Sequence, residues 1–431
     1  MAQGVFSRRR PRQYDGTSAA EVAVFDATEK LLAETSLQEL TVAQILENAK
    51  LSRANFYHYF PNKYSVVVAL LSKLVGQSYS EAAPWDSAPG RIRVHTMGET
   101  LARTLDMWSA HGPMIFAVIE HMHTQPTIAE AWRYTFARFV DSVAEQIAHE
   151  RAVGAAPAGS DARMLAYLLV SAVERVFYVS SRGLDPVLQD PGDVIAPLAA
   201  LHQAVVYGDP RGGGNVAATR TRATPAMAPP APPTTPQPDL DTETARVLLG
   251  AMAELLDGMS LADISVAKVI ERAGTSRASF YFYFRSKEDA FVALFRSAAS
   301  QVVDDVAALG TVPLNGPEDF VQLMRTWLAH DVLRGPIVRN AVHDWPRLPE
   351  LRAAYLEVIA AVEEAIAVLI SDARGDADEG MPPAAQYAAT LVWAIERTVA
   401  GSLAGEDHLA DVDAVAEMLG RVVHSAVVGR R

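Results

Sequence analysis

The residues best suited to chemistry in this chain occur twice. The segment from Ser52 to Lys63 reads SRANFYHYFPNK, and the segment from Ser276 to Lys287, 224 positions later, reads SRASFYFYFRSK. Arginine, asparagine, histidine, serine and tyrosine side chains can bind phosphate oxygens or form hydrogen bonds with base edges in a DNA major groove. Both segments therefore predict contact with a nucleic acid.

The repeat extends beyond these two segments. Residues 41–71 and 265–295 align without a gap, and 15 of the 31 aligned positions are identical. One chain therefore carries a unit that two separate subunits normally supply.

Short helices must position these side chains. Thr41 is expected to cap a helix over residues 42–49 and Ser52 a helix over 53–59, and Ser265 and Ser276 repeat the two caps. This pattern is typical of a helix-turn-helix. Because aromatic rings bury much area in a small domain, we expect four phenylalanines to be core residues, whereas the hydroxyls of Tyr57 and Tyr281 are free to reach DNA. The four are Phe56, Phe60, Phe280 and Phe284.

The copies differ where bases would be read. Asn55 and His58 of the first copy are replaced by Ser279 and Phe282 in the second, while Arg53 is matched by Arg277. The two copies are therefore expected to read different base sequences.

Composition narrows the class of protein. The chain has 431 residues, 50% of them hydrophobic, a formal net charge of -13 and no cysteine. Thiolate metal sites and disulfides are excluded, and the acidic charge argues against a general nucleic-acid coat but not against a locally basic surface. We expect a cytoplasmic protein, because no signal peptide or membrane span stands out. We expect no cofactor and no metal site, since His121 and His123 would point apart on a helix. No catalytic constellation stands out, so an enzyme is not expected.

A linker divides the chain. Residues 208–241 hold eight prolines and four glycines and cannot bury enough surface to fold. The predicted organisation is a flexible basic arm (1–16), a helix-turn-helix domain (17–75), a helical ligand-type domain (76–207), the linker, a second helix-turn-helix domain (242–300) and a second helical ligand-type domain (301–431). We call residues 1–207 the first half and 242–431 the second half.

A fainter repeat links the C-terminal helices of the halves. SAVER at 171–175 matches WAIER at 393–397, and Gly112-Pro113 matches Gly335-Pro336, so the whole unit is duplicated. Glu174-Arg175 and Glu396-Arg397 lie inside apolar helices. We expect them to be buried and paired, either between the halves or at the mouth of a pocket.

The motif resembles the DNA-binding signature of the TetR family of transcriptional regulators. The signature is a run ending Phe-Tyr-x-Tyr-Phe-x-x-Lys, preceded by a helix such as VAQILENA at 42–49 or VAKVIERA at 266–273. The resemblance implies a three-helix DNA-binding domain, a fourth helix leading to an all-helical ligand domain, and pairing through the last two helices. It also implies that a recognition surface faces DNA, formed by Arg53, Asn55, Tyr57, His58, Tyr59 and Lys63, by Arg277, Ser279, Tyr281, Tyr283 and Lys287, and by the cap residues Thr41, Ser52, Ser265 and Ser276.

The chain departs from the family pattern in two ways. Lys50 occupies a turn position that is Gly274 in the second copy, and most members are homodimers with a single repeat. The regions before the two copies also differ. A basic arm of Arg8, Arg9, Arg10 and Arg12 precedes the first copy and can reach phosphates or a minor groove, whereas DLDTE at 239–243 precedes the second and would repel DNA. The first copy is therefore expected to bind more strongly.

Aromatic residues of the C-terminal helices are mostly expected in the core, and some of them as walls of an apolar effector pocket. The candidate walls are Trp108, Phe116, Trp132, Phe136, Phe177, Trp327, Trp345, Tyr387 and Trp393.

The sequence thus predicts an all-α tandem regulator, a repressor, whose halves form a pseudo-dimer on a double-stranded operator with unlike half-sites about 34–36 Å apart. A small apolar molecule would modulate it. Three alternatives stay open: the second copy does not bind DNA, two chains associate further, or the protein is a helical ligand carrier with a relic motif.

Overall fold

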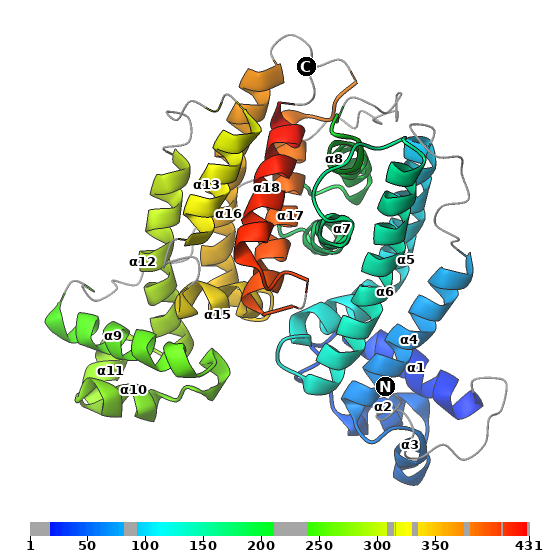
Figure 1. Ribbon diagram of the computed structural model, residues 1–431. Helices are drawn as coiled ribbons and strands as arrows, with labels where there is room; N and C mark the ends of the chain where they lie inside the picture. Colours follow the sequence, from blue (N-terminus) through cyan, green and yellow to red (C-terminus); the bar gives the residue numbers. More distant parts are fainter. Residues whose placement is uncertain are drawn as a thin grey trace. The chain divides into compact units, whose positions relative to one another are not determined.

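The computed structural model describes residues 18–81, 93–210, 240, 242–307, 314, 316–329, 335–374, 380–406 and 408–428. Within these residues the chain forms α-helices and two short 3-10 helices, with no strand (Figure 1). The predicted all-α fold class is confirmed. The chain divides into two compact units, one of Met1–Glu81 with His111–Thr135 and one of Ala82–Ala110 with Phe136–Arg431. The predicted basic arm and nearly all of the linker lie outside the described residues.

The first DNA-binding-type domain consists of α1 (Ala19–Leu32), α2 (Val42–Ala49) and α3 (Arg53–Tyr59), and α4 (Lys63–Glu81) leads away from it. Polar caps start the first three helices: Ser18 and Thr41 form capping boxes, and Ser52 accepts from the N–H of Asn55. The rings of Phe25, Phe56 and Phe60 meet in the core with centroids 5.7 and 5.8 Å apart.

The second domain repeats this arrangement in α9 (Glu243–Gly258), the 3-10 helix η2 (Leu261–Asp263), α10 (Val266–Ala273), α11 (Arg277–Tyr283) and α12 (Lys287–Ala307). Ser265 and Ser276 cap α10 and α11, as predicted. All four phenylalanines assigned to the two cores are buried. The turn after the second helix is left-handed in both domains, at Lys50 (φ 54°) and Gly274 (φ 62°).

The remaining helices of the first half are α5 (Arg93–His121), α6 (Pro126–Ala152), α7 (Ala162–Ser181) and, after the 3-10 helix η1 (Pro191–Val194), α8 (Ile195–Tyr207). Those of the second half are α13 (Pro317–Ala329), α15 (Pro336–Asp344), α16 (Pro349–Arg374), α17 (Ala384–Leu403) and α18 (Val412–Val427). The two sets correspond at a nearly constant offset. Where α5 bends at His111, just before Pro113, the described residues of the second half form the separate helices α13 and α15.

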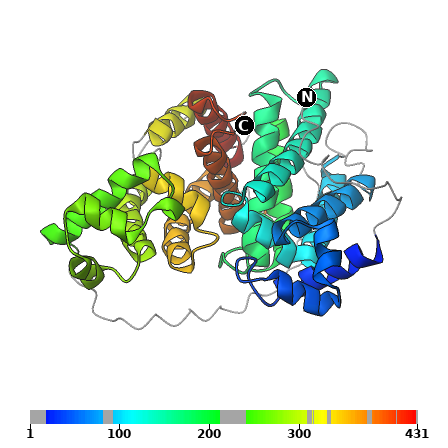
Figure 2. The ribbon, with the colours of Figure 1, turned by 90° about the horizontal axis from the view of Figure 1, so that it is seen from below.

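Helices from the two halves share one core. Within the larger unit α7 lies against α17, and α8 contacts both α17 and α18. We call this contact of α7 and α8 with α17 and α18 the seam. Figures 1 and 2 agree in placing α13 beside α18, where Gly420 allows the two backbones to approach closely. By length and composition α7 is apolar enough to cross a membrane, but 78% of its most apolar window is buried inside the protein.

Candidate nucleic-acid interface

Both predicted recognition helices present a tyrosine to solvent. Tyr57 on α3 and Tyr281 on α11 are each 54% exposed, although each stands next to a fully buried phenylalanine. The tyrosine ring meets its buried neighbour edge-on in both helices, with centroids 5.4 Å apart for Phe56 and 5.5 Å for Phe280. The buried ring therefore fixes the position of the exposed one, and the two helices offer the same tyrosine geometry.

The next two positions are matched as well. His58 stands perpendicular to Tyr59, and Phe282 stands perpendicular to Tyr283, with centroids 4.9 Å apart in each pair. Arg53, Asn55 and Arg277 are exposed, whereas Ser279 is half-buried and its hydroxyl lies 2.9 Å from the hydroxyl of Ser276. The first helix therefore offers more unpaired polar groups than the second.

The four predicted cap residues lie on the exposed surface beside these helices. Thr41 accepts from the N–H of Gln44 and donates its own hydroxyl to the Gln44 side chain at 2.7 Å. Ser52, Ser265 and Ser276 each accept a backbone N–H three residues later. Their oxygens thus terminate helices, and DNA contact by these residues stays a prediction.

Lys63 and Lys287 have partners inside their own domains. The Lys63 ammonium donates to the carbonyls of Gln38 and Leu40, 2.9 and 2.7 Å away. The Lys287 ammonium donates to the carbonyls of Leu261, Ala262 and Ile264, at 2.7–3.1 Å. Burial lowers the pKa of Lys63. These bonds tie the start of α4 and α12 to the loop before α2 and α10, which is a structural role that the sequence analysis missed, and phosphate contact remains an untested second role.

The predicted pocket residues do not form a single group. Trp108 and Phe177 meet edge-on with ring centroids 5.9 Å apart, and Phe136 lies against Tyr167. Six of the nine side chains are buried and three are half-buried. The buried residues are Trp108, Phe136, Phe177, Trp345, Tyr387 and Trp393; the half-buried residues are Phe116, Trp132 and Trp327.

In the second half the aromatic residues fill the space between helices. Trp345 stacks on Tyr355 with centroids 5.2 Å apart and planes 8° apart, and it also meets Trp393 and Tyr178. Tyr387 lies beneath the guanidinium of Arg374. Trp345, Tyr387 and Trp393 have no exposed surface, so a role as pocket walls would require them to move.

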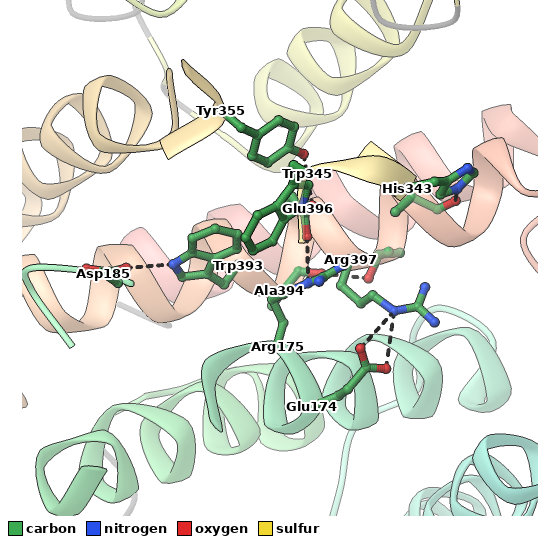
Figure 3. Close-up of polar contacts among 12 residues, drawn as sticks. Glu174, Arg175, Asp185, His343, Trp345, Tyr355, Trp393, Ala394, Glu396 and Arg397 are labelled. Atoms are coloured by element: carbon green, nitrogen blue, oxygen red, sulfur yellow. Dashed lines mark hydrogen bonds and ion pairs between the residues drawn. The ribbon is translucent and has the colours of Figure 1, made fainter. Parts of the chain in front are cut away.

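The repeated Glu-Arg pairs meet across the seam, which decides one of the alternatives left open by the sequence. Arg175 Nε lies 3.0 Å from Glu396 Oε2, and Arg397 Nε lies 3.2 Å from Glu174 Oε2 (Figure 3). All four side chains are almost completely buried. Each arginine therefore pairs with the acid of the other half, in a reciprocal arrangement.

Further bonds hold the Glu396 carboxylate. The indole N–H of Trp345 and the hydroxyl of Tyr355 both donate to its Oε1, at 3.2 and 2.8 Å. Burial, reinforced by the negative charge of Glu396, raises the pKa of Tyr355 well above its usual range. The guanidinium of Arg175 also lies over the Trp345 ring, 5.3 Å from its centroid. One first-half residue thus contacts a residue at the C-terminal end of α15.

The Arg397 side of the seam is built around Tyr167. The Tyr167 hydroxyl accepts from Arg397 at 3.0 Å and donates to Glu406. Burial raises the pKa of Tyr167. Gly401 faces this ring so closely that a methyl group there would overlap the Tyr167 hydroxyl. A large side chain of one half therefore occupies space that a glycine of the other half leaves open.

A buried pair of acidic residues, Asp185 and Glu363, also joins the two halves. Asp185 accepts from the indole N–H of Trp393 at 2.6 Å and from the backbone N–H of Val187 at 2.7 Å. Glu363 on α16 lies beside it, and burial together with the charge of Asp185 raises the pKa of Glu363 to about 9. Glu363 therefore carries its proton at neutral pH. The sequence analysis missed Glu363, although it continues the apolar stripe of Ile359, Ile366 and Ile370, which was the signal for its burial.

Helix α15 connects the seam with the second DNA-binding domain. At its C-terminal end the Trp345 indole N–H donates to Glu396, and Nε2 of His343 donates to the Ala400 carbonyl of α17 at 3.2 Å. Nearer its start, the Asn340 side-chain oxygen accepts from the N–H of Leu261 at 2.9 Å. The carbonyl of Leu261 is in turn bound by Lys287. A short chain of bonds therefore runs from the seam to the start of α12.

Comparisons with known proteins agree with this architecture. The profile of bacterial regulatory proteins of the tetR family matches residues 24–70 and 248–294, and the profile of the C-terminal domain of the transcriptional regulator EthR matches residues 97–208. The HTH-type transcriptional regulator EthR of Mycobacterium tuberculosis strain H37Rv is 27% identical over 192 residues, covering 44% of this chain and 88% of that protein. The protein of the same name from Mycolicibacterium smegmatis is 26% identical over 194 residues, covering 44% and 86%.

Among solved structures, Salmonella enterica GusR aligns with a TM-score of 0.37 and 16% identity, covering 43% of this chain and 95% of that one. The two tetR-family matches coincide with the two domains that carry α3 and α11. The chain is therefore a TetR-family transcriptional regulator with two TetR-type repeats in one polypeptide.

Proposed function

We propose that the two halves of one chain act together as a pseudo-dimeric repressor that binds an operator with unlike half-sites. The observation that carries this proposal is the seam, in which Arg175 pairs with Glu396 and Arg397 pairs with Glu174. Buried charges are stable only when they are paired, so each half requires its counterpart to satisfy its own arginine. Helices α3 and α11 would then enter successive major grooves of the operator DNA in the cytoplasm.

The effector is a small, mainly apolar molecule that binds in the first half. Two observations support this assignment. The EthR C-terminal profile matches the first half, at residues 97–208, and the corresponding region of the second half is filled by Trp345, Tyr355 and Trp393. Trp108, Phe136 and Phe177 are the aromatic residues that such a molecule would contact.

Effector binding would act by shifting the population between a DNA-binding and a non-binding state. In the second half, α15 supplies a physical link for this coupling, because it bonds to the seam through Trp345 and to the DNA-binding domain through Asn340. Replacing Asn340 with Ala would leave the Leu261 N–H unbonded and would weaken the coupling without touching the DNA-facing surface.

A second candidate function has an observation in its favour. In α11 the Ser279 hydroxyl lies within hydrogen-bond distance of Ser276, and Phe282 has no polar atom, so the second helix has fewer groups for base readout. In this version only the first repeat binds DNA, and the second serves as a pairing module.

Footprinting on the DNA upstream of the protein's own gene, with a salt series, distinguishes these functions. Two unequal protected patches on successive turns, each lost with its own variant, Tyr57→Ala or Tyr281→Ala, are the expected result. Tyr134→Ala is the matched control, because Tyr134 is 68% exposed but lies on α6, outside both DNA-binding domains. Protection that depends on Tyr57 alone supports the second candidate. No salt-dependent protection with any fragment refutes both. A mass larger than one chain in solution supports the alternative in which two chains associate further.

A further inference from the structure

We infer that Phe282 reads the C5-methyl group of a thymine in the half-site bound by the second repeat, at the place where His58 bonds to a polar base edge in the first. This inference rests on the proposed function, because it requires both α3 and α11 to enter a major groove. It adds the chemical feature that the second half-site must carry.

The two rings occupy matched positions. His58 and Phe282 each follow a tyrosine that is 54% exposed and precede a tyrosine that they meet at 4.9 Å, with interplanar angles of 88° and 86°. Each ring stands two positions after a buried phenylalanine, Phe56 or Phe280, on a seven-residue helix. The two repeats therefore hold the His58 and Phe282 rings in the same orientation, and the two positions differ only in the chemistry of the ring.

Phe282 does not serve the core of its own domain. It is 67% exposed, whereas Phe280 and Phe284 are 0% and 2% exposed. Tyr281 beside it is also exposed, so the helix turns two adjacent aromatic rings toward solvent. Two neighbouring exposed rings on a seven-residue helix indicate a surface that becomes covered when a partner binds.

Base-pair chemistry selects the partner of this ring. An imidazole can donate or accept a hydrogen bond at a base edge, but a phenyl ring can do neither. In the major groove of unmodified DNA the apolar group that a base pair presents is the thymine C5-methyl. Since the Ser279 hydroxyl is engaged with Ser276, readout by α11 shifts further toward apolar contact. The structure thus assigns thymine to the base beneath Phe282.

The test uses the full chain and a duplex that contains both footprinted half-sites. Each thymine of the second half-site is replaced in turn by deoxyuridine, which removes only the methyl group and keeps the base pair. For the unmodified protein, one such replacement is expected to weaken binding about fourfold, the effect of one buried methyl-sized group. Phe282→Ala should bind the thymine and deoxyuridine duplexes equally, while Phe282→Leu, which stays apolar, should keep part of the preference.

Two controls separate the possible outcomes. Deoxyuridine in the first half-site should affect the unmodified protein and Phe282→Ala to the same extent, and His58→Phe should gain a preference for thymine at the position that His58 reads. If Phe282→Ala binds weakly, lower salt restores measurable affinity for every duplex alike. The inference is overturned if the unmodified protein and Phe282→Ala respond equally to every replacement in the second half-site. The footprint would still support the proposed function in that case. Absence of a footprint refutes the proposed function itself.

Discussion

Replacing Glu396 with Gln tests whether the reciprocal ion pairs hold the halves together. Glutamine has nearly the same shape, and its side-chain oxygen can still accept from Trp345 and Tyr355. The substitution therefore removes the charge opposite Arg175 and little else. Because Arg175 is 1% exposed, its charge would be left in a nonpolar interior without a partner.

The expected loss follows from burial. Removing one partner of a buried ion pair typically destabilises a protein by about 3–5 kcal/mol. Arg175 and Glu396 form an ion pair at 3.0 Å in which Nε and Oε2 lack an aligned hydrogen bond, so we expect the lower end, about 3 kcal/mol. The seam lies in the larger compact unit, Ala82–Ala110 with Phe136–Arg431, and for a unit of that size this corresponds to a fall in Tm of roughly 4–5 °C.

Glu254→Gln is the matched control. Glu254 lies 2.6 Å from Arg272, a shorter contact, but both side chains are more than half exposed. Such a pair contributes about 0–1 kcal/mol, and the substitution changes the net charge by the same amount. Differential scanning calorimetry measures both variants. Adding Arg175→Met to Glu396→Gln should recover most of the lost Tm, since a nonpolar replacement removes the stranded charge. If the Tm of Glu396→Gln falls no further than the Tm of Glu254→Gln, burial does not determine the strength of the Arg175–Glu396 pair and the reasoning is wrong.

Three further predictions concern stability. Lys50→Gly should raise stability by about 1 kcal/mol in thermal unfolding, because glycine adopts the left-handed conformation at φ 54° without strain; an unchanged or lower Tm contradicts this. Gly420→Ala should lower stability by about 1–3 kcal/mol, because the new methyl would lie 2.6 Å from the Val321 nitrogen, whereas Gly250→Ala on α9, with open space around it, should not destabilise. Glu363 is protonated in the folded protein up to a pKa of about 9 but ionises near 4.5 when unfolded, so its contribution is complete below pH 4.5 and is lost as the pH rises toward 9. Glu363→Gln should therefore flatten the decline in denaturation midpoint between pH 5 and 9, and parallel profiles for the two proteins would show that Glu363 does not titrate in this range.

The sequence predicted the local structure of the repeats well, because the signals for it are local. Thr41, Ser52, Ser265 and Ser276 each cap the expected helix, and the left-handed turn lies at Lys50 and Gly274 as the motif implied. Capping depends on residues three positions apart, and the turn depends on a single backbone angle.

The seam could be predicted only in part. An acid and an arginine in an apolar helix indicated burial, but α7 is apolar on nearly all sides, so its periodicity did not show which face meets which neighbour. The Lys287 and Asn340 bonds also escaped prediction. They join residues that are 23–26 and 79 positions apart, and only tertiary packing brings these together.

The contact of Tyr167 with Gly401 makes the pairing of the two halves asymmetric. At the 222-residue offset of the repeat, the second-half counterpart of Tyr167 is Ala389 and the first-half counterpart of Gly401 is Val179. Two copies of the first half would press a valine into the space that Tyr167 needs, and two copies of the second would set a small residue against a glycine and leave a gap. Shape complementarity at this contact therefore favours pairing of each half with the other half over pairing with a copy of itself. If the proposed function holds, a regulator assembled in this way would present a different half to each end of its operator.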